Sequence, residues 1–175
     1  MASKSVISLV VVLIALIVTS SLAIAEQFTA GTGENNAELY IEWSDGYIAE
    51  FSVRFDSPTV TGLNLFDIVE ASTGLTTVRQ YYGPDAFIDG INFNGHSNSG
   101  YGGGADWWHY WIKDSGQADW LSPGFGASER TVSNGDSDGW IYGRDESPVP
   151  EPVSIAMFGL GGLILARCRR TSVIS

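Results

Sequence analysis

Residues 38–55 of the chain are ELYIEWSDGYIAEFSVRF, two apolar runs separated by an Asp-Gly pair at 45 and 46. Asp-Gly supplies the positive φ angles that a tight hairpin turn needs. In the second run, the apolar positions from Phe51 to Phe55 alternate with polar residues, which is the two-residue period of a strand with one buried face. The stretch therefore predicts a β-hairpin with one dry face and one wet face.

The period changes once after this hairpin. Four apolar residues between Leu65 and Val69 recur at helical spacing, which predicts a helix over residues 63–72 that ends at Gly74. Strand signals then return, separated by clusters of Gly, Pro, Asn or Asp. We expect strands at residues 75–82, 87–93, 107–113 and 140–142. This order predicts an α+β fold, in which one helix packs on a mixed β-sheet.

The N-terminal end is typical of a secretory signal peptide. A lysine, an apolar run over residues 6–18 and small residues at Ala23 and Ala25 follow one another. The run is shorter than the roughly 20 apolar residues that span a bilayer, which disfavours an uncleaved anchor. We therefore expect cleavage after Ala25, so that residues 1–25 are the signal peptide and residues 26–36 a loose polar leader.

A Pro-Glu-Pro motif, a short apolar stretch and an arginine cluster end the chain. The motif is Pro150, Glu151 and Pro152, the apolar stretch covers residues 153–166, and Arg167, Arg169 and Arg170 lie in the basic tail 167–175. The prolines stop a helix from extending upstream, and the arginines favour the cytoplasmic side of a membrane. These three elements resemble the PEP-CTERM sorting signal of Gram-negative bacteria. The resemblance implies export, transient anchoring in the inner membrane, processing by an exosortase-type protease, and release to the cell surface or the exopolysaccharide matrix.

Charge and cysteine content set limits on the region between these ends. All twenty acidic residues but only five of the nine basic ones lie in residues 26–151, so the net charge there is 5 − 20 = −15. Such a segment is repelled by nucleic acid, which we exclude as a partner. The single cysteine, Cys168, lies in the basic tail, so the domain has to rely on its core without a disulfide. We place the domain at residues 37–145 and a Pro-rich linker at residues 146–152.

Short motifs within residues 46–143 carry a second resemblance. They are the helix at 63–72, the Trp-His-Tyr-Trp run that starts at Trp108, and Asn-Gly-Asp at 134–136 ahead of Trp140. Together they are similar to the β-grasp-type domain at the C-terminus of transcobalamin and in related bacterial surface proteins. The resemblance implies a ubiquitin-like sheet and, in some members, a bound corrinoid or another flat ligand.

The run Trp107 to Lys113 is the densest chemical signal in the domain. In a strand, Trp107, His109, Trp111 and Lys113 share one face. A single helix cannot cover both faces of a sheet, so this face predicts an exposed aromatic platform that binds a sugar ring or a planar cofactor. Burial of both faces by loops is the alternative, because tryptophan is mostly buried in proteins.

Residues 134–145 have the spacing of a calcium-binding EF-hand loop. Asn134, Asp136, Asp138 and Asp145 would supply the oxygens, and calcium prefers several oxygen ligands. No flanking helices are expected, and Asn-Gly-Asp before a strand is also an ordinary turn. Calcium is therefore one of two interpretations of this segment.

Catalytic signatures are not found in the sequence. Residues 95–99 lack the second glycine of a nucleophile elbow, and residues 101–104 lack the lysine of a phosphate-binding loop. We therefore predict a non-enzymatic surface protein that binds polysaccharide or a small ligand. A polysaccharide-processing hydrolase with paired carboxylates, such as Asp106 and Asp136, and a corrinoid-binding surface protein are the alternative hypotheses.

Overall fold

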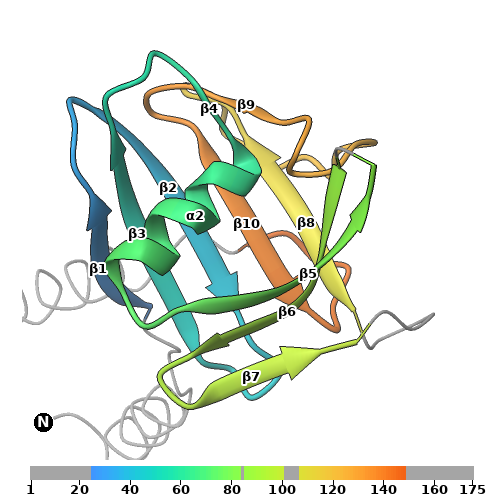
Figure 1. Ribbon diagram of the computed structural model, residues 1–175. Coiled ribbons are helices and arrows are strands. Elements are labelled where there is room, and N and C mark those ends of the chain that lie inside the picture. Colours follow the sequence, from blue (N-terminus) through green and yellow to red (C-terminus); the bar gives the residue numbers. More distant parts are fainter. Residues whose placement is uncertain (1–24, 84, 101–106, 149–175) are drawn as a thin grey trace, which may run out of the picture.

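The computed structural model describes residues 25–83, 85–100 and 107–148. Figure 1 shows a large sheet with a helix and a smaller sheet lying across the same face of it. The large sheet has the order β1 (Glu26–Gly31), β3 (Ile48–Phe55), β2 (Asn35–Glu42), β10 (Ser137–Tyr142) and β8 (Trp108–Lys113). The smaller sheet has the order β5 (Thr76–Tyr82), β6 (Asp85–Phe93) and β7 (His96–Ser99). The helix is α2 (Gly62–Ser72), and β4 (Val60–Thr61) pairs with β9 (Thr131–Val132).

The predicted α+β, β-grasp-like class is wrong. Strands hold 50% of the described residues and helix only 9%, so the fold is mainly β. The strands divide among three sheets, and α2 is the one helix in the described part of the chain. The prediction failed because segments interpreted as loops, notably residues 26–31 and 96–99, pair with neighbouring strands. Such pairing satisfies their backbone groups and raises the strand content above what the sequence patterns predicted.

The hairpin that residues 38–55 predict is confirmed as β2 and β3, which pair antiparallel from Asn35 to Glu42. Gly46 has a φ of 84°, the positive angle expected of the Asp-Gly turn. The Trp43 N–H donates to the Tyr47 carbonyl at 3.0 Å and closes the turn.

The large sheet has two chemically different faces, which we call the inner and the outer face. Leu39 and Phe51 mark the inner face, and neither side chain is exposed to solvent. Tyr40 and Glu50, the residues next to them in the chain, mark the outer face because successive side chains in a strand point to opposite sides. The helix and the smaller sheet cover only the inner face (Figure 1).

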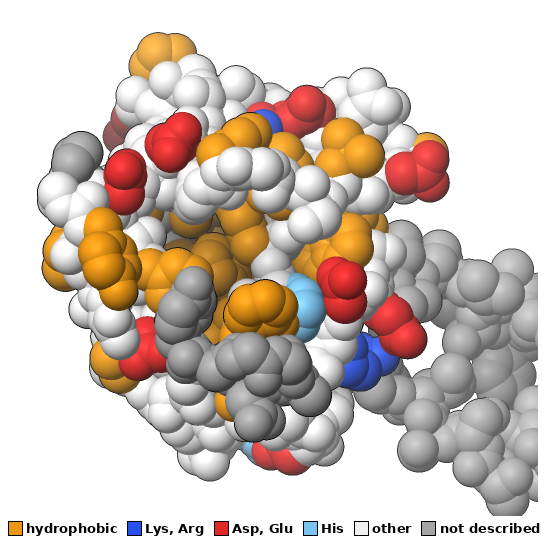
Figure 2. Space-filling view, turned by 90° about the vertical axis from the view of Figure 1, so that its right-hand side faces the viewer, with side chains coloured by type: hydrophobic (Ala, Val, Ile, Leu, Met, Phe, Trp, Pro, Cys, Tyr) orange, Lys and Arg blue, Asp and Glu red, His pale blue; other side chains and the backbone are white. Residues whose placement is uncertain are grey.

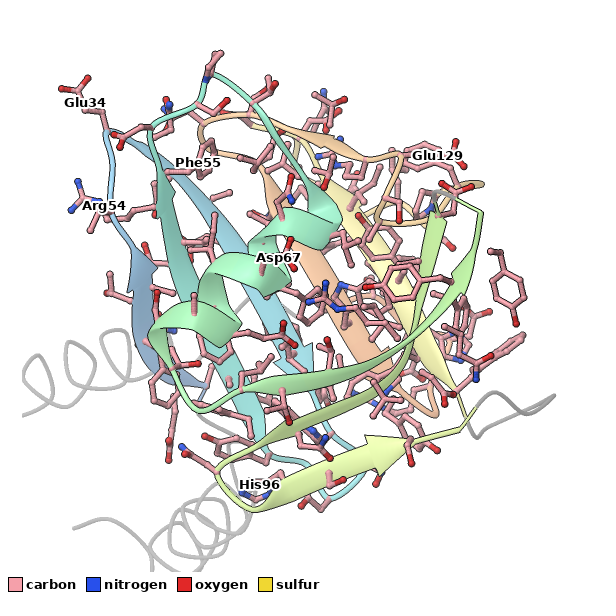
Figure 3. The ribbon with its side chains drawn as sticks, in the orientation of Figure 1. Glu34, Arg54, Phe55, Asp67, His96 and Glu129 are labelled. Atoms are coloured by element: carbon pink, nitrogen blue, oxygen red, sulfur yellow. The ribbon has the colours of Figure 1, made fainter. Side chains whose placement is uncertain are left out.

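The chain crosses the end of β3 between β1 and β2, because β1 lies parallel to β3 and not next to β2. Gly33 lies in this crossing segment, has a φ of 140°, and passes close to the backbone at the end of β3. A Cβ atom on Gly33 would lie 2.2 Å from the carbonyl carbon of Phe55. The Arg54 side chain donates to the Gly33 carbonyl at 3.0 Å, and Figure 3 labels Arg54 and Phe55 beside the crossing. The predicted loose leader at residues 26–36 is therefore wrong, because most of it is β1 and the start of β2.

The core lies between the inner face and the layer formed by α2 and the smaller sheet. The ring of Phe51 lies 5.2 Å from that of Phe28 on β1 and 5.1 Å from that of Phe93 on β6. Full burial of one such side chain stabilises a fold by about 1.5–3 kcal/mol, so this cluster helps to hold β1, β3 and β6 together. The helix adds Leu65, Phe66 and Val69, all fully buried.

Both ends of α2 are capped by threonine. At the start, Thr61 Oγ1 accepts the Asn64 N–H and the Asn64 side chain accepts the Thr61 N–H, each at 3.1 Å, which satisfies two otherwise unpaired donors. At the end, the Thr73 hydroxyl donates to the Val69 carbonyl at 2.8 Å. The helix ends at Ser72, as expected, and Gly74 follows the extended C-cap Thr73, but Gly74 does not have the positive φ of a glycine cap.

The terminal predictions fall outside the described residues. They are Ala23, the sorting motif at 150–152, the apolar stretch at 153–166 and the arginines of the basic tail. Within residues 25–83, 85–100 and 107–148, no helix combines the length and the apolar character needed to cross a bilayer.

Candidate functional site

The outer face carries a groove of about 380 Å³. That volume falls within the range of about 300–1,000 Å³ that is usual for small-molecule sites. All five strands of the large sheet contribute to it, together with two segments that follow β8 and β10. The lining residues are Ala25, Gln27, Glu38, Tyr40, Ile48, Glu50, Lys113, Trp120, Ser137 and Pro148.

Strand register arranges the polar lining in rows across the sheet. Lys113 pairs with Ser137, and Ser137 pairs with Glu38, so these three form one row. Tyr40 pairs with Glu50 in the next row. Glu38 and Glu50 are therefore diagonal neighbours on adjacent strands, a separation that one ligand can bridge.

One wall of the groove depends on the glycine in the middle of β10. A Cβ atom on Gly139 would lie 2.6 Å from Pro148 and 3.2 Å from the ring of Trp120. The missing side chain lets both residues pack closely against the sheet. Lys113 extends to this wall, with its ammonium 4.8 Å from the centre of the Trp120 ring, and forms a cation–π contact.

The two carboxylates of the groove have amide partners. Glu38 accepts a hydrogen bond from Asn36 at 2.8 Å, and Glu50 accepts one from Gln27 at 2.6 Å. Among the described ion pairs, none involves either carboxylate. Burial raises the pKa of Glu38, the hydrogen bond from Asn36 opposes that rise, and the charge of Glu50 adds to it.

Glu42, on the same face of β2, is in a different situation. It forms an ion pair with Arg144 and accepts a hydrogen bond from the Tyr40 hydroxyl at 3.2 Å. Burial, followed by the charge of Glu42, raises the pKa of Tyr40 well above its usual value, so this hydroxyl stays protonated. The negative charge of Glu42 is therefore compensated within the protein, whereas the charges of Glu38 and Glu50 are not.

The structure places the four residues of the predicted aromatic platform in different surroundings. Lys113 lines the groove, and Trp111 packs beside it against the apolar cluster of Ala25, Tyr40, Ile48 and Ile141. Trp107 donates its ring N–H to His109, whose other ring nitrogen lies 3.4 Å from Asp145. His109, Trp111 and Lys113 thus project to the outer face, and ligand binding by this set stays a prediction.

The four residues of the predicted calcium loop do not converge on one point. Asn134 accepts the Asn36 N–H, and Asp136 accepts the backbone N–H groups of Ser115 and Ser133. Asp138 is fully buried, whereas 81% of the Asp145 side chain is exposed. Across the described segments, no group of three or more His, Cys, Asp or Glu side chains is arranged to hold a metal ion. Calcium binding stays a prediction without a geometric counterpart here.

Asp138 belongs instead to a buried cluster of charged groups. It accepts a hydrogen bond from the Tyr110 hydroxyl at 2.7 Å and lies 3.4 Å from Arg130, whose guanidinium also approaches Asp114 at 2.7 Å and Asp136 at 3.4 Å. Burial raises the pKa of Asp138 to about 6, although Tyr110 and Arg130 both oppose that rise. Arg130 thus stands among the carboxylates where a cation was predicted, and it ties the end of β8 to the start of β10.

Most residues of the groove are not indicated by the sequence patterns. Glu38 and Tyr40 alternate with buried leucine and isoleucine on β2, and Glu50 continues the pattern on β3, which could have indicated a polar outer face. Gln27 and Trp120 gave no such signal, because one falls in the expected leader and the other in a loop.

The surface as a whole is acidic. Figure 2 shows acidic side chains spread over one side of the molecule, with basic side chains scarce there and apolar groups gathered in a central hollow. An even spread of carboxylates is typical of a solvated surface, so charge alone does not single out a site.

Comparisons with known proteins add no relative. The chain matches no protein-family model, and no curated protein or solved structure was found to be similar to it.

Proposed function

We propose that this chain is an exported, PEP-CTERM-sorted protein of the cell surface or exopolysaccharide matrix of a Gram-negative bacterium. In this proposal it binds polysaccharide, or a small polar ligand, in the outer-face groove without processing it. The groove is the observation that carries the binding part. It combines an indole and apolar side chains with amide, hydroxyl and carboxylate groups, the mixture that suits a sugar ring with apolar faces and polar edges.

The sorting part rests on the two ends of the chain. It predicts that an exosortase-type protease removes the C-terminal segment after transient anchoring in the inner membrane. Mass spectrometry of the secreted protein should then detect neither residues 1–25 nor Cys168. A secreted form that retains Cys168 would contradict processing at the Pro-Glu-Pro motif.

The binding part is tested with the full chain and the exopolysaccharide of the bacterium that produces it. Trp120→Ala should weaken retention of the protein on the polymer about tenfold, since loss of an aromatic wall typically costs 1–3 kcal/mol. Phe125→Ala is the matched control, because Phe125 is also an aromatic residue outside the strands, is 41% exposed and does not line the groove. Equal retention of both variants would place binding elsewhere.

The hydrolase alternative has no support from the described residues. Both carboxylate oxygens of Asp136 are occupied by backbone N–H groups, and Asp106 lies outside the described part of the chain. Shortening of the polymer during incubation would revive that alternative, whereas retention without shortening supports a binding protein.

A further inference from the structure

The charge balance of the groove indicates the kind of ligand it fits. Glu38 and Glu50 have amide partners but no cationic partner in the described structure, while Lys113 is the one basic residue in the lining. The Lys113 ammonium lies over the Trp120 ring, and none of the described ion pairs joins it to Glu38 or Glu50. The side of the groove over β2 and β3 is therefore anionic and lacks a counter-ion from the protein.

A metal ion is a poor match for this side of the groove. Calcium takes six to eight oxygen ligands and magnesium about six in near-octahedral geometry. The groove offers two carboxylates that each hold an amide hydrogen bond already, and the described residues contain no metal-binding group of three. A positively charged group that donates hydrogen bonds can pair with these carboxylate oxygens, and it needs fewer oxygen partners than calcium or magnesium does.

A primary ammonium group is such a donor. It carries three N–H groups, which can be shared between the two carboxylates and a third acceptor such as the Ser137 hydroxyl or the Gln27 amide oxygen. Bonds of this kind between charged partners are about twice as strong as neutral ones. The indole of Trp120 and the apolar Ile48 and Pro148 then provide contact area for the carbon skeleton that carries the ammonium group.

We propose that the groove selects an amine-bearing saccharide, a hexosamine unit whose amino group is free rather than acetylated. The ammonium group lies between Glu38 and Glu50, and the ring lies toward Trp120. This inference rests on the proposed function, since it names the class of saccharide that the same groove binds. Acetylation would remove the positive charge and two of the three donors, so the one remaining neutral N–H could not bridge both carboxylates.

Calorimetric titration of the full chain at 0.15 M salt tests the proposal. Three probes are used: a glucosamine trimer, the N-acetylglucosamine trimer and spermidine, which has amines but no sugar ring. The salt limits non-specific attraction to the acidic surface, because the Debye length is then about 8 Å. We expect the glucosamine trimer to bind at least about tenfold more tightly than either of the other probes.

Matched variants separate the groove from the overall charge. Glu50→Gln should weaken binding of the glucosamine trimer about tenfold, whereas Glu129→Gln, which removes the same charge from an exposed loop (Figure 3), should leave it unchanged. Lys113→Gln should strengthen it several-fold, since it removes the one cation of the groove. Circular dichroism checks that each variant is folded, and the opposite expected signs at residues 50 and 113 exclude a general loss of structure.

Each of the other possible results would refute a specific part of the proposal. Equal binding of the two trimers would refute selection of the amine and leave saccharide binding in place. If spermidine bound as tightly as the glucosamine trimer, the proposal that the groove recognises a sugar ring would be refuted. If the substitutions at residues 50 and 129 weakened binding equally, the effect would come from the overall surface charge and not from the groove. Failure of both trimers to bind would refute this inference, whereas the proposed saccharide binding is refuted separately if the protein is not retained on the exopolysaccharide.

Discussion

Replacing Asp138 by asparagine should change how the stability of the fold depends on pH. The carboxyl group is fully buried, and its pKa is about 6 in the folded state. An aspartate in an unfolded chain has a pKa of about 3.9. Because the folded state holds the proton more tightly, the stability contributed by this group is complete below about pH 4 and is lost as the pH rises through about 6.

The size of the effect follows from the difference between these two pKa values. About two pKa units correspond to about 3 kcal/mol, which the wild-type protein should lose relative to Asp138→Asn between pH 4 and pH 7. Urea denaturation of both proteins at several pH values gives the difference in free energy of unfolding directly, and the exposed Asp119→Asn serves as a control. Parallel stability curves for wild type and Asp138→Asn would show that burial does not govern the titration of Asp138.

Two further substitutions test the packing around this cluster and the core. Gly62→Ala should lower the free energy of unfolding by about 1–3 kcal/mol, because its Cβ would lie 2.6 Å from Asp138 and 2.8 Å from the Tyr110 hydroxyl. Gly74→Ala, with no atom within 4 Å of the added Cβ, should change it by no more than about 0.5 kcal/mol, and similar losses in thermal denaturation would count against this packing. Phe51→Ala should cost about 3–5 kcal/mol by emptying the centre of the aromatic cluster, and a loss below 1 kcal/mol would contradict the described core.

Local patterns predicted local structure well. The Asp-Gly turn, the alternation around Phe51 and the helical spacing of Leu65 and Val69 each depend on residues close together in the chain, and the hairpin and the helix lie where these patterns indicate. The fold class was wrong for two reasons. The strand β1 forms by pairing with β3, which lies far from it in sequence, and β7 pairs with the preceding strand β6 but contains only polar residues, so it has no apolar alternation to indicate a strand. Phe28, for example, packs only once β3 and β6 are in place.

The candidate site was less predictable for the same reason. The pattern of β8 correctly indicated that His109, Trp111 and Lys113 would share a face, but not that the groove would lie mostly over β2 and β3. The alignment of the groove residues on neighbouring strands comes from the pairing of Glu38 with Ser137, and no local sequence pattern specifies this pairing. Part of the predicted calcium loop at residues 134–145 forms β10, so Gly139 lies within a strand, and calcium binding there stays a prediction.

The parallel pairing of β2 with β10 also constrains the order in which the domain can assemble. These two strands come from opposite ends of the domain, so one edge of β2 stays unpaired until β10 has been synthesised and has paired with it. Long-range pairing of this kind slows folding, since a long loop has to close before the contact forms. A newly made chain would thus stay incompletely folded until β10 is available, and a product truncated before Ser137 would carry an exposed edge prone to aggregation.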